Sequence, residues 1–177
     1  MAAVEIERVR TARLTGTRPA FRDADELHPL MADPRVAAWL WPEGPPSPAE
    51  VRSLLVRDAD HWKRHRWGPW LVRDAATGAA VGRVGLKGTE VGGREEVEVA
   101  WMIAADRWGE GLATEIAAEA VRVAFAILAL ADLVAFTLVE NAPSRRVMDH
   151  LGFAYERDIE HAGLPHVLYR LSRPAIG

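Results

Sequence analysis

Two glycines, Gly109 and Gly111, stand where an apolar segment gives way to a helical pattern, in DRWGEGLATE (106–115). The first turn of a helix has N–H groups without intrahelical partners, and the helix dipole favours negative charge there. Because glycine has no side chain, a phosphate can approach the backbone of residues 108–114, provided that Glu110 points outward. A plain turn would use the same glycines. The third glycine of a dinucleotide fingerprint and the Lys-Ser or Lys-Thr of a Walker loop are missing.

Polar residues flank this turn on both sides in the sequence. EEVEVAWMI (95–103) carries an acidic cluster in which Glu96 and Glu98 lie on one face of a strand, because side chains alternate along a strand. After the turn, ENAPSRR (140–146) contains Asn141 and Ser144. Asn141 before Ala-Pro is a good helix N-cap in its own right.

The elements that position these residues predict an α+β fold with a mixed sheet. Strands are expected at 11–20 (an edge strand), on both sides of the turn DAATG within 67–88, and at 95–103, 132–140, 154–160 and 166–172. Helices are expected at 22–40 with a break at Pro34, after an N-cap at Ser47, at 111–130 and at 142–153. The strands 95–103 and 132–140 are joined by a helical crossover and are therefore expected to be parallel.

Composition narrows the class of protein. The chain has 177 residues, 49% of them apolar and 27% charged, with a formal charge of -3, which is typical of one soluble domain. This charge gives no electrostatic reason to expect nucleic acid or an anionic membrane surface as a partner. There are no cysteines, which excludes disulfides and thiolate sites. The N-terminal residues 1–14 have no leader-like apolar core, and the longest apolar stretch is too short to span a bilayer, so a cytoplasmic location is expected.

The segments EVEVAWMIAADRWGEGLATEIAAEAV and VENAPSRRVMDHLGF together resemble the GCN5-related N-acetyltransferases, of the branch that acetylates ribosomal proteins (RimJ/RimL type). The likeness extends to TARLTGTRPAFRDADELHPLMADPRVAAWL and WLVRDAATGAAVGRVGL, and so covers nearly the whole chain in order. One position departs from the family pattern. Trp108 stands where the phosphate loop of the family usually begins with Gln or Arg, and Arg107 precedes it.

The resemblance implies one domain over 1–177, with a mixed, mostly antiparallel sheet, a splayed central pair of parallel strands and flanking helices. Its parts would be a first strand with acceptor-side helices (11–66), antiparallel strands (67–103), and an acetyl-CoA loop and helix followed by the C-terminal strand, helix and strands (104–177). It also implies acetyl-CoA as co-substrate, no metal, and a monomer or homodimer. The acceptor would be a primary amine, either a protein N-terminus or a small molecule.

Acetyl-CoA would bind between the splayed strands, with its pantetheine arm along the first of them and its diphosphate on the glycine loop. The residues that the resemblance places against it are Trp101, Met102, Ile103, Trp108, Gly109, Glu110, Gly111, Leu112, Ala113, Thr114 and Asn141. Acetyl transfer to an amine requires a base, and Glu98 matches the strand glutamate of the family, with Glu96 as its substitute. The alternative for Glu98 is a solvent-facing carboxylate. Ser144 would protonate the departing sulfur, and the alternative for Asn141 and Ser144 is helix capping.

The remaining aromatic and histidine residues leave structural alternatives open. His61 and His65 have a spacing that can bind zinc, but a solvated basic face is favoured because the surroundings are cationic. His161 and His166 flank the last loop, and a surface role is favoured for both. Seven tryptophans are present. Trp39 and Trp41 flank the proline-rich segment 41–50 and would either line an acceptor pocket or, as we favour, pack the helices on the sheet.

Two other functions remain open from the sequence. The first is a non-catalytic module that binds or senses acyl-CoA. The second is a transferase for another donor such as succinyl-CoA, which would need a cation near the thioester. Arg83, Lys87 and Arg94 are the candidates for that cation.

Overall fold

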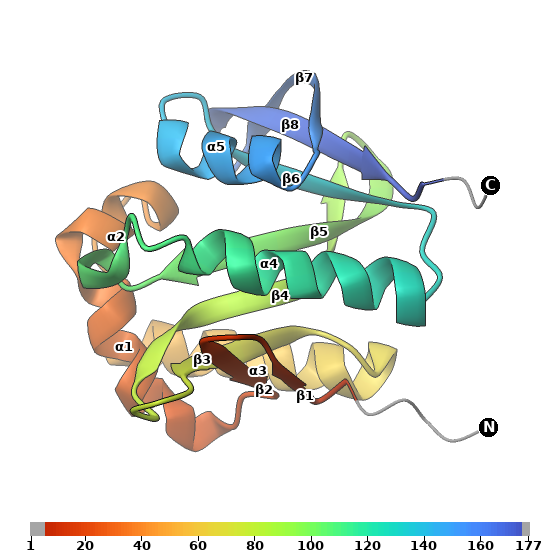
Figure 1. The fold of residues 1–177 in the computed structure, drawn as a ribbon. Helices are drawn as coiled ribbons and strands as arrows, with labels where there is room; N and C mark the ends of the chain where they lie inside the picture. The colour runs from red at the N-terminus through yellow and green to blue at the C-terminus, as the bar shows by residue number, and fades with distance from the viewer. Residues whose placement is uncertain (1–5, 175–177) are drawn as a thin grey trace.

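Eight strands form one mixed sheet in the computed structural model, which describes residues 6–174 (Figure 1). The ends of the predicted 1–177 domain, and part of the segment 1–14 considered for a leader, lie outside these residues. In chain order the strands are β1 (Arg8–Arg10), β2 (Leu14–Thr17), β3 (Pro69–Asp74), β4 (Ala80–Val91), β5 (Arg94–Ile103), β6 (Asp132–Leu138), β7 (Ala154–His161) and β8 (Leu164–Ser172). Their order across the sheet is β1-β2-β3-β4-β5-β6-β8-β7.

Five α-helices cover the sheet. They are α1 (Ala24–Ala32), α2 (Pro34–Leu40), α3 (Pro48–His65), α4 (Leu112–Arg122) and α5 (Ala142–His150). Side-chain alternation along β5 divides the core between the two faces: Met102 packs with residues of α1, α2 and α3, whereas Val99 and Ile103 pack with α4. In Figure 1, α4 and α5 lie in front of the sheet and α3 lies behind it. None of the helices within residues 6–174 is long and apolar enough to cross a membrane.

The predicted α+β class is confirmed, with two differences in detail. The segment 11–20 was expected to form an edge strand, but β2 lies between β3 and a short outer strand, β1. Gly16 allows this pairing, because a Cβ at that position would stand 2.8 Å from the Cγ2 of Val9. The helix expected at 111–130 is α-helical only to Arg122 and continues as a wider π-helical turn over Val123–Ile127.

The parallel pair of strands creates the opening on which the site depends. β5 and β6 are paired at one position, Glu98 opposite Val134. After Glu98, β5 pairs only with β4, and after Val134, β6 pairs only with β8. The backbone edge of β5 after Glu98 is therefore left without a neighbouring strand, as expected for a splayed pair.

The end of α3 is held against β4 by His61. Gly88 N–H donates to Nε2 of His61 at 3.0 Å, so the ring proton must be on Nδ1, which lies 2.9 Å from the carbonyl oxygen of Trp67. His61 is thus half-buried and structural rather than solvated, whereas His65 is exposed as expected. No group of three metal-ligating side chains occurs within residues 6–174.

We expect His61 to make folding stability depend on pH. Burial lowers the pKa of His61 below its usual value, so its stabilisation is present above about pH 6.5 and is lost as the pH falls through the lower folded-state pKa. Protonation of Nε2 breaks the bond from Gly88, which should cost about 1 kcal/mol. Urea unfolding between pH 7.5 and 5 should show this loss in the wild type but not in His61→Leu. His65→Leu is the control, and an identical pH dependence in His61→Leu would contradict the assignment.

Candidate functional site

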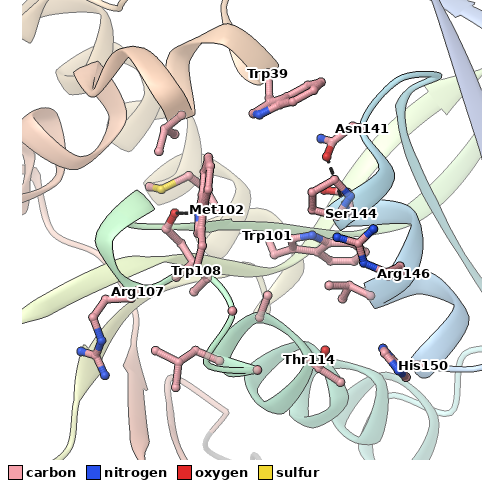
Figure 2. Close-up of a pocket in the computed structure, with 18 of the residues that line it drawn as sticks. Trp39, Trp101, Met102, Arg107, Trp108, Thr114, Asn141, Ser144, Arg146 and His150 are labelled. Atoms are coloured by element: carbon pink, nitrogen blue, oxygen red, sulfur yellow. Dashed lines mark hydrogen bonds between the residues drawn. The ribbon is translucent and has the colours of Figure 1, made fainter.

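A cleft of about 440 Å³ opens where β5 and β6 separate, between α2, α4 and α5 (Figure 2). Its walls come from four parts of the chain: α2, the end of β5, the loop that leads into α4, and α5. The lining residues are Val36, Trp39, Leu40, Trp101, Met102, Ile103, Arg107, Trp108, Gly109, Gly111, Leu112, Ala113, Thr114, Asn141, Pro143, Ser144, Arg146, Val147 and His150. Among the residues that the sequence placed at the site, all but Glu96, Glu98 and Glu110 line this cleft.

The loop into α4 presents a row of unused N–H groups. Within residues 6–174, the N–H groups of Gly109 to Thr114 have no protein acceptor, and the first helical bond of α4 is donated by the N–H of Glu115 to Gly111. The carbonyl oxygen of Glu110 accepts from the guanidinium of Arg13 at 3.0 Å. Because a trans peptide is planar, the N–H of Gly111 points away from that carbonyl. The loop is thus arranged as an anion-binding site at a helix N-terminus.

Both glycines of the loop adopt a conformation that other residues rarely take. Gly109 has φ +82° and Gly111 has φ +77°. A Cβ built on Gly109 meets no atom within 4 Å. Glycine is therefore favoured there by the left-handed backbone, not by crowding within the protein.

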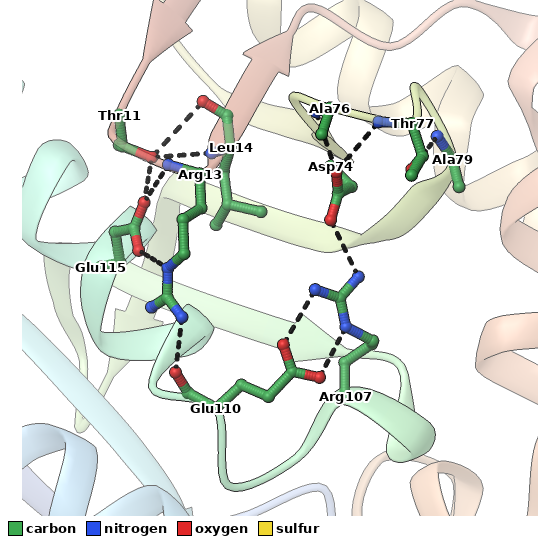
Figure 3. A network of polar contacts seen from close by, with 10 residues as sticks. All are labelled: Thr11, Arg13, Leu14, Asp74, Ala76, Thr77, Ala79, Arg107, Glu110 and Glu115. Carbon is green, nitrogen blue, oxygen red and sulfur yellow. Dashed lines mark hydrogen bonds and ion pairs between the residues drawn. The ribbon is translucent and has the colours of Figure 1, made fainter.

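Ion pairs among charged side chains hold the loop in place (Figure 3). Arg107 makes a two-pronged ion pair with the Glu110 carboxylate, at 2.7 and 2.9 Å, and also reaches Asp74 at 3.2 Å. Asp74 is itself fixed, because it accepts the N–H groups of Ala76 and Thr77 in the β3–β4 turn. The Glu110 side chain thus points outward, as expected, and this residue can contribute only its backbone to the site.

A second brace acts on the first turn of α4. The Glu115 carboxylate accepts from the hydroxyl of Thr11 at 2.6 Å, and from the backbone N–H and guanidinium of Arg13 at 2.8 and 2.7 Å. Arg13 therefore joins the carbonyl of Glu110 to the side chain of Glu115. These contacts come from residues about 100 positions earlier in the chain, and they connect the segment just before β2 to the loop and to the first turn of α4.

Trp108, which departs from the family pattern, has a positioning role in the loop. Its indole N–H donates to the carbonyl oxygen of Ile103 at 2.8 Å, which ties the loop to the end of β5. The residue remains 45% exposed and forms part of the cleft wall. The unpartnered N–H groups of the loop belong to the backbone, so the change from Gln or Arg leaves them in place.

Glu98 is buried rather than solvent-facing, and unlike the similarly buried Glu96 it has no ion-pair partner within residues 6–174. Glu98 is 8% exposed, and its Oε2 atom has no hydrogen-bond partner. Burial raises the pKa of Glu98, although Lys87, directly opposite on β4, and Arg83 oppose the change. By contrast, Arg170 binds both oxygens of Glu96, at 2.8 and 3.1 Å, and holds the pKa of Glu96 below its usual value. Of the two carboxylates, Glu98 therefore has the higher affinity for a proton.

Asn141 begins α5 at the opposite wall of the cleft. Its Oδ1 atom accepts the N–H of Ser144 at 3.2 Å, and its Nδ2 atom donates to the Thr137 hydroxyl at 2.9 Å. The capping interpretation is therefore correct for Asn141, which is buried and also lines the cleft. Ser144 lies one turn further along, with its side chain on the cleft (Figure 2).

The two tryptophans beside the proline-rich segment have different positions. Trp39 lines the cleft from α2, whereas Trp41 packs against the core beneath α1 and α3. Sequence reasoning missed one whole wall of the cleft, the face of α5 formed by Pro143, Arg146, Val147 and His150. Their helical spacing, in phase with one another along α5, is the signal that could have identified them.

Neither the last two histidines nor the candidate cations for a succinyl group line the cleft. His161 and His166 pack against Phe136, with ring centroids 4.7 and 6.0 Å away from it, and are half-buried. Arg83 forms a buried ion pair with Asp58. Arg94 lies 3.8 Å from Glu96.

Comparison with known proteins agrees with this geometry. The family model described as "Acetyltransferase (GNAT) domain" matches residues 13–154. The uncharacterized protein YkkB of Bacillus subtilis is 26% identical over 100 residues, and this match spans 56% of the chain and 58% of YkkB.

Solved structures share the fold at low identity. An acetyltransferase from Agrobacterium tumefaciens has a TM-score of 0.81 and 23% identity, over 98% of each chain. RimL, a ribosomal L7/L12 α-N-protein acetyltransferase solved with coenzyme A, has a TM-score of 0.76 and 16% identity, over 94% of this chain and 98% of RimL. The family model, the splayed strands and the glycine loop together show that the chain belongs to the GNAT family of acetyltransferases.

Proposed function

We propose that this acetyltransferase moves the acetyl group of acetyl-CoA to a primary amine by direct attack of the amine on the thioester. The observation that carries the proposal is the row of six unpartnered N–H groups, Gly109 to Thr114, at the edge of a cleft whose other wall is the unpaired edge of β5. The N–H groups match a diphosphate, and the strand edge matches the amides of a pantetheine arm. Together they fit coenzyme A along its length.

The proposed chemistry divides among three groups. The amine nitrogen bonds to the thioester carbon, the carbon–sulfur bond breaks, and the electron pair leaves with sulfur. Glu98 takes the proton of the attacking amine, and Ser144 gives its proton to the thiolate and regains one from solvent water. A backbone N–H near Met102 stabilises the oxyanion. Met102 lies four residues beyond Glu98 on the same face of β5, about 13 Å along the strand, so a water relay carries the proton.

The acceptor is a primary amine, either at a protein N-terminus or on a small molecule. RimL, which has the same fold, acts on a ribosomal protein according to its name, and this supports testing N-terminal peptides first. Acetyl is favoured over succinyl as the acyl group, because none of the candidate cations Arg83, Lys87 and Arg94 lines the cleft.

Two measurements test the proposal in sequence. Coenzyme A at 100 times its dissociation constant should stabilise the folded state by about 2.7 kcal/mol and raise the melting temperature. Thiol release from acetyl-CoA should then be measured with N-terminal peptides, amino acids, polyamines and aminoglycosides. The compound whose amine is the acceptor should accelerate the release, and the others should not. A melting temperature that millimolar coenzyme A leaves unchanged would contradict the proposal.

A further inference from the structure

We infer that Arg146, assisted by His150, binds the 3′-phosphate of coenzyme A, an inference that rests on the proposed function. Coenzyme A carries a diphosphate and a separate phosphate on the 3′ position of its ribose. The N–H groups of the loop can take up the diphosphate. The third phosphate needs cationic or N–H donors elsewhere on the cleft wall.

Two side chains of α5 are placed to supply those donors. Arg146 and His150 are separated by one helical turn, both line the cleft, and both are exposed. Figure 2 shows them on the side of α5 that faces α4 and Thr114. A coenzyme whose diphosphate lies on the first turn of α4 would direct its nucleoside into this space between α4 and α5.

The charge of Arg146 is available, unlike that of the other arginine of the cleft. Arg107 is occupied by Glu110 and Asp74. Arg146 takes part in none of the ion pairs formed within residues 6–174, although α5 itself carries Asp149. A guanidinium without a carboxylate partner, directed at an anion-binding cleft, matches the fork geometry of a phosphate.

The neighbouring arginine provides an internal comparison. Arg145 points the other way, because its guanidinium donates to the Tyr169 hydroxyl and to the carbonyl of Val139, both at 3.2 Å. It is not part of the cleft lining. Arg145→Gln thus removes the same charge from the same helix without touching the cleft.

The test is isothermal titration of wild type, Arg146→Gln, His150→Gln and Arg145→Gln with coenzyme A and with 3′-dephospho-coenzyme A. Arg146→Gln should weaken coenzyme A binding about five- to tenfold and 3′-dephospho-coenzyme A binding less than about twofold. His150→Gln should show the same selectivity with a smaller loss, and Arg145→Gln should affect neither ligand. Unchanged melting temperatures of the variants without ligand verify that each is folded.

Specific outcomes would overturn the inference. If Arg146→Gln weakens the binding of both ligands equally, or of neither ligand, then Arg146 does not bind the 3′-phosphate. If the wild type binds neither ligand, the proposed function fails instead. The two failures are therefore distinguishable.

Discussion

Replacing Glu98 with glutamine is expected to lower kcat by about 10² to 10⁴-fold, the usual contribution of a general base. Coenzyme A affinity should stay within about twofold of the wild type, because Glu98 does not line the cleft. The rate of the wild type should rise with pH through the raised pKa of Glu98, since only the ionised carboxylate can accept the amine proton. In Glu98→Gln this dependence should be absent. Steady-state kinetics between pH 5 and 9 measures both effects.

The same substitution should make the protein more stable while it loses activity. A carboxyl whose pKa is raised on folding binds more protons in the folded state, so its contribution to stability falls as pH rises through that pKa. Glutamine removes this penalty. We expect the melting temperature at pH 8 to rise by roughly 2 to 4 °C, which corresponds to about 1 kcal/mol in a chain of this size.

Two further variants serve as controls for Glu98. Glu96→Gln breaks the ion pair with Arg170 and should lower stability, while kcat falls less than about fivefold. Ser144→Ala should also cost less than about tenfold, because a thiolate leaves tolerably well without an acid. Full activity in Glu98→Gln would show that another group accepts the amine proton, whatever the two controls do.

Replacing Gly109 is expected to weaken coenzyme binding by an amount that depends on the charge of the new side chain. Asparagine tolerates a positive φ, so Gly109→Asn keeps the backbone and adds a neutral side chain where the diphosphate would lie. Gly109→Asp adds the same shape with a negative charge. We expect the dissociation constant of coenzyme A to increase about 10-fold for asparagine and about 100-fold for aspartate.

The control for Gly109 is Gly163, in the β7–β8 turn. It has φ +73° and, like Gly109, meets no atom within 4 Å of a built Cβ. Gly163→Asn and Gly163→Asp should leave the dissociation constant within about twofold of the wild-type value. Equal losses for Gly109→Asn and Gly109→Asp would mean that the loop does not face an anion.

Local rules were enough to predict most of the elements and part of the site. Hydrophobic periodicity located the strands and helices, and Ser47 and Asn141 cap α3 and α5 as their positions predicted. The helical connection between β5 and β6 predicted that they are parallel. The glycine spacing before α4 identified the loop, because left-handed backbone and a helix N-terminus are properties of a few consecutive residues.

Long-range packing decided what these rules could not reach. Glu96 and Glu98 have the same residue type and the same strand face, yet Arg170, 74 positions away, occupies one and leaves the other buried without a partner. Arg13 aligns the loop from nearly 100 residues away. The ionisation and hydrogen bonding of a side chain depend on which groups share its low-dielectric environment, and the tertiary fold sets that environment. Backbone conformation, by contrast, depends mainly on residues that are adjacent in the chain.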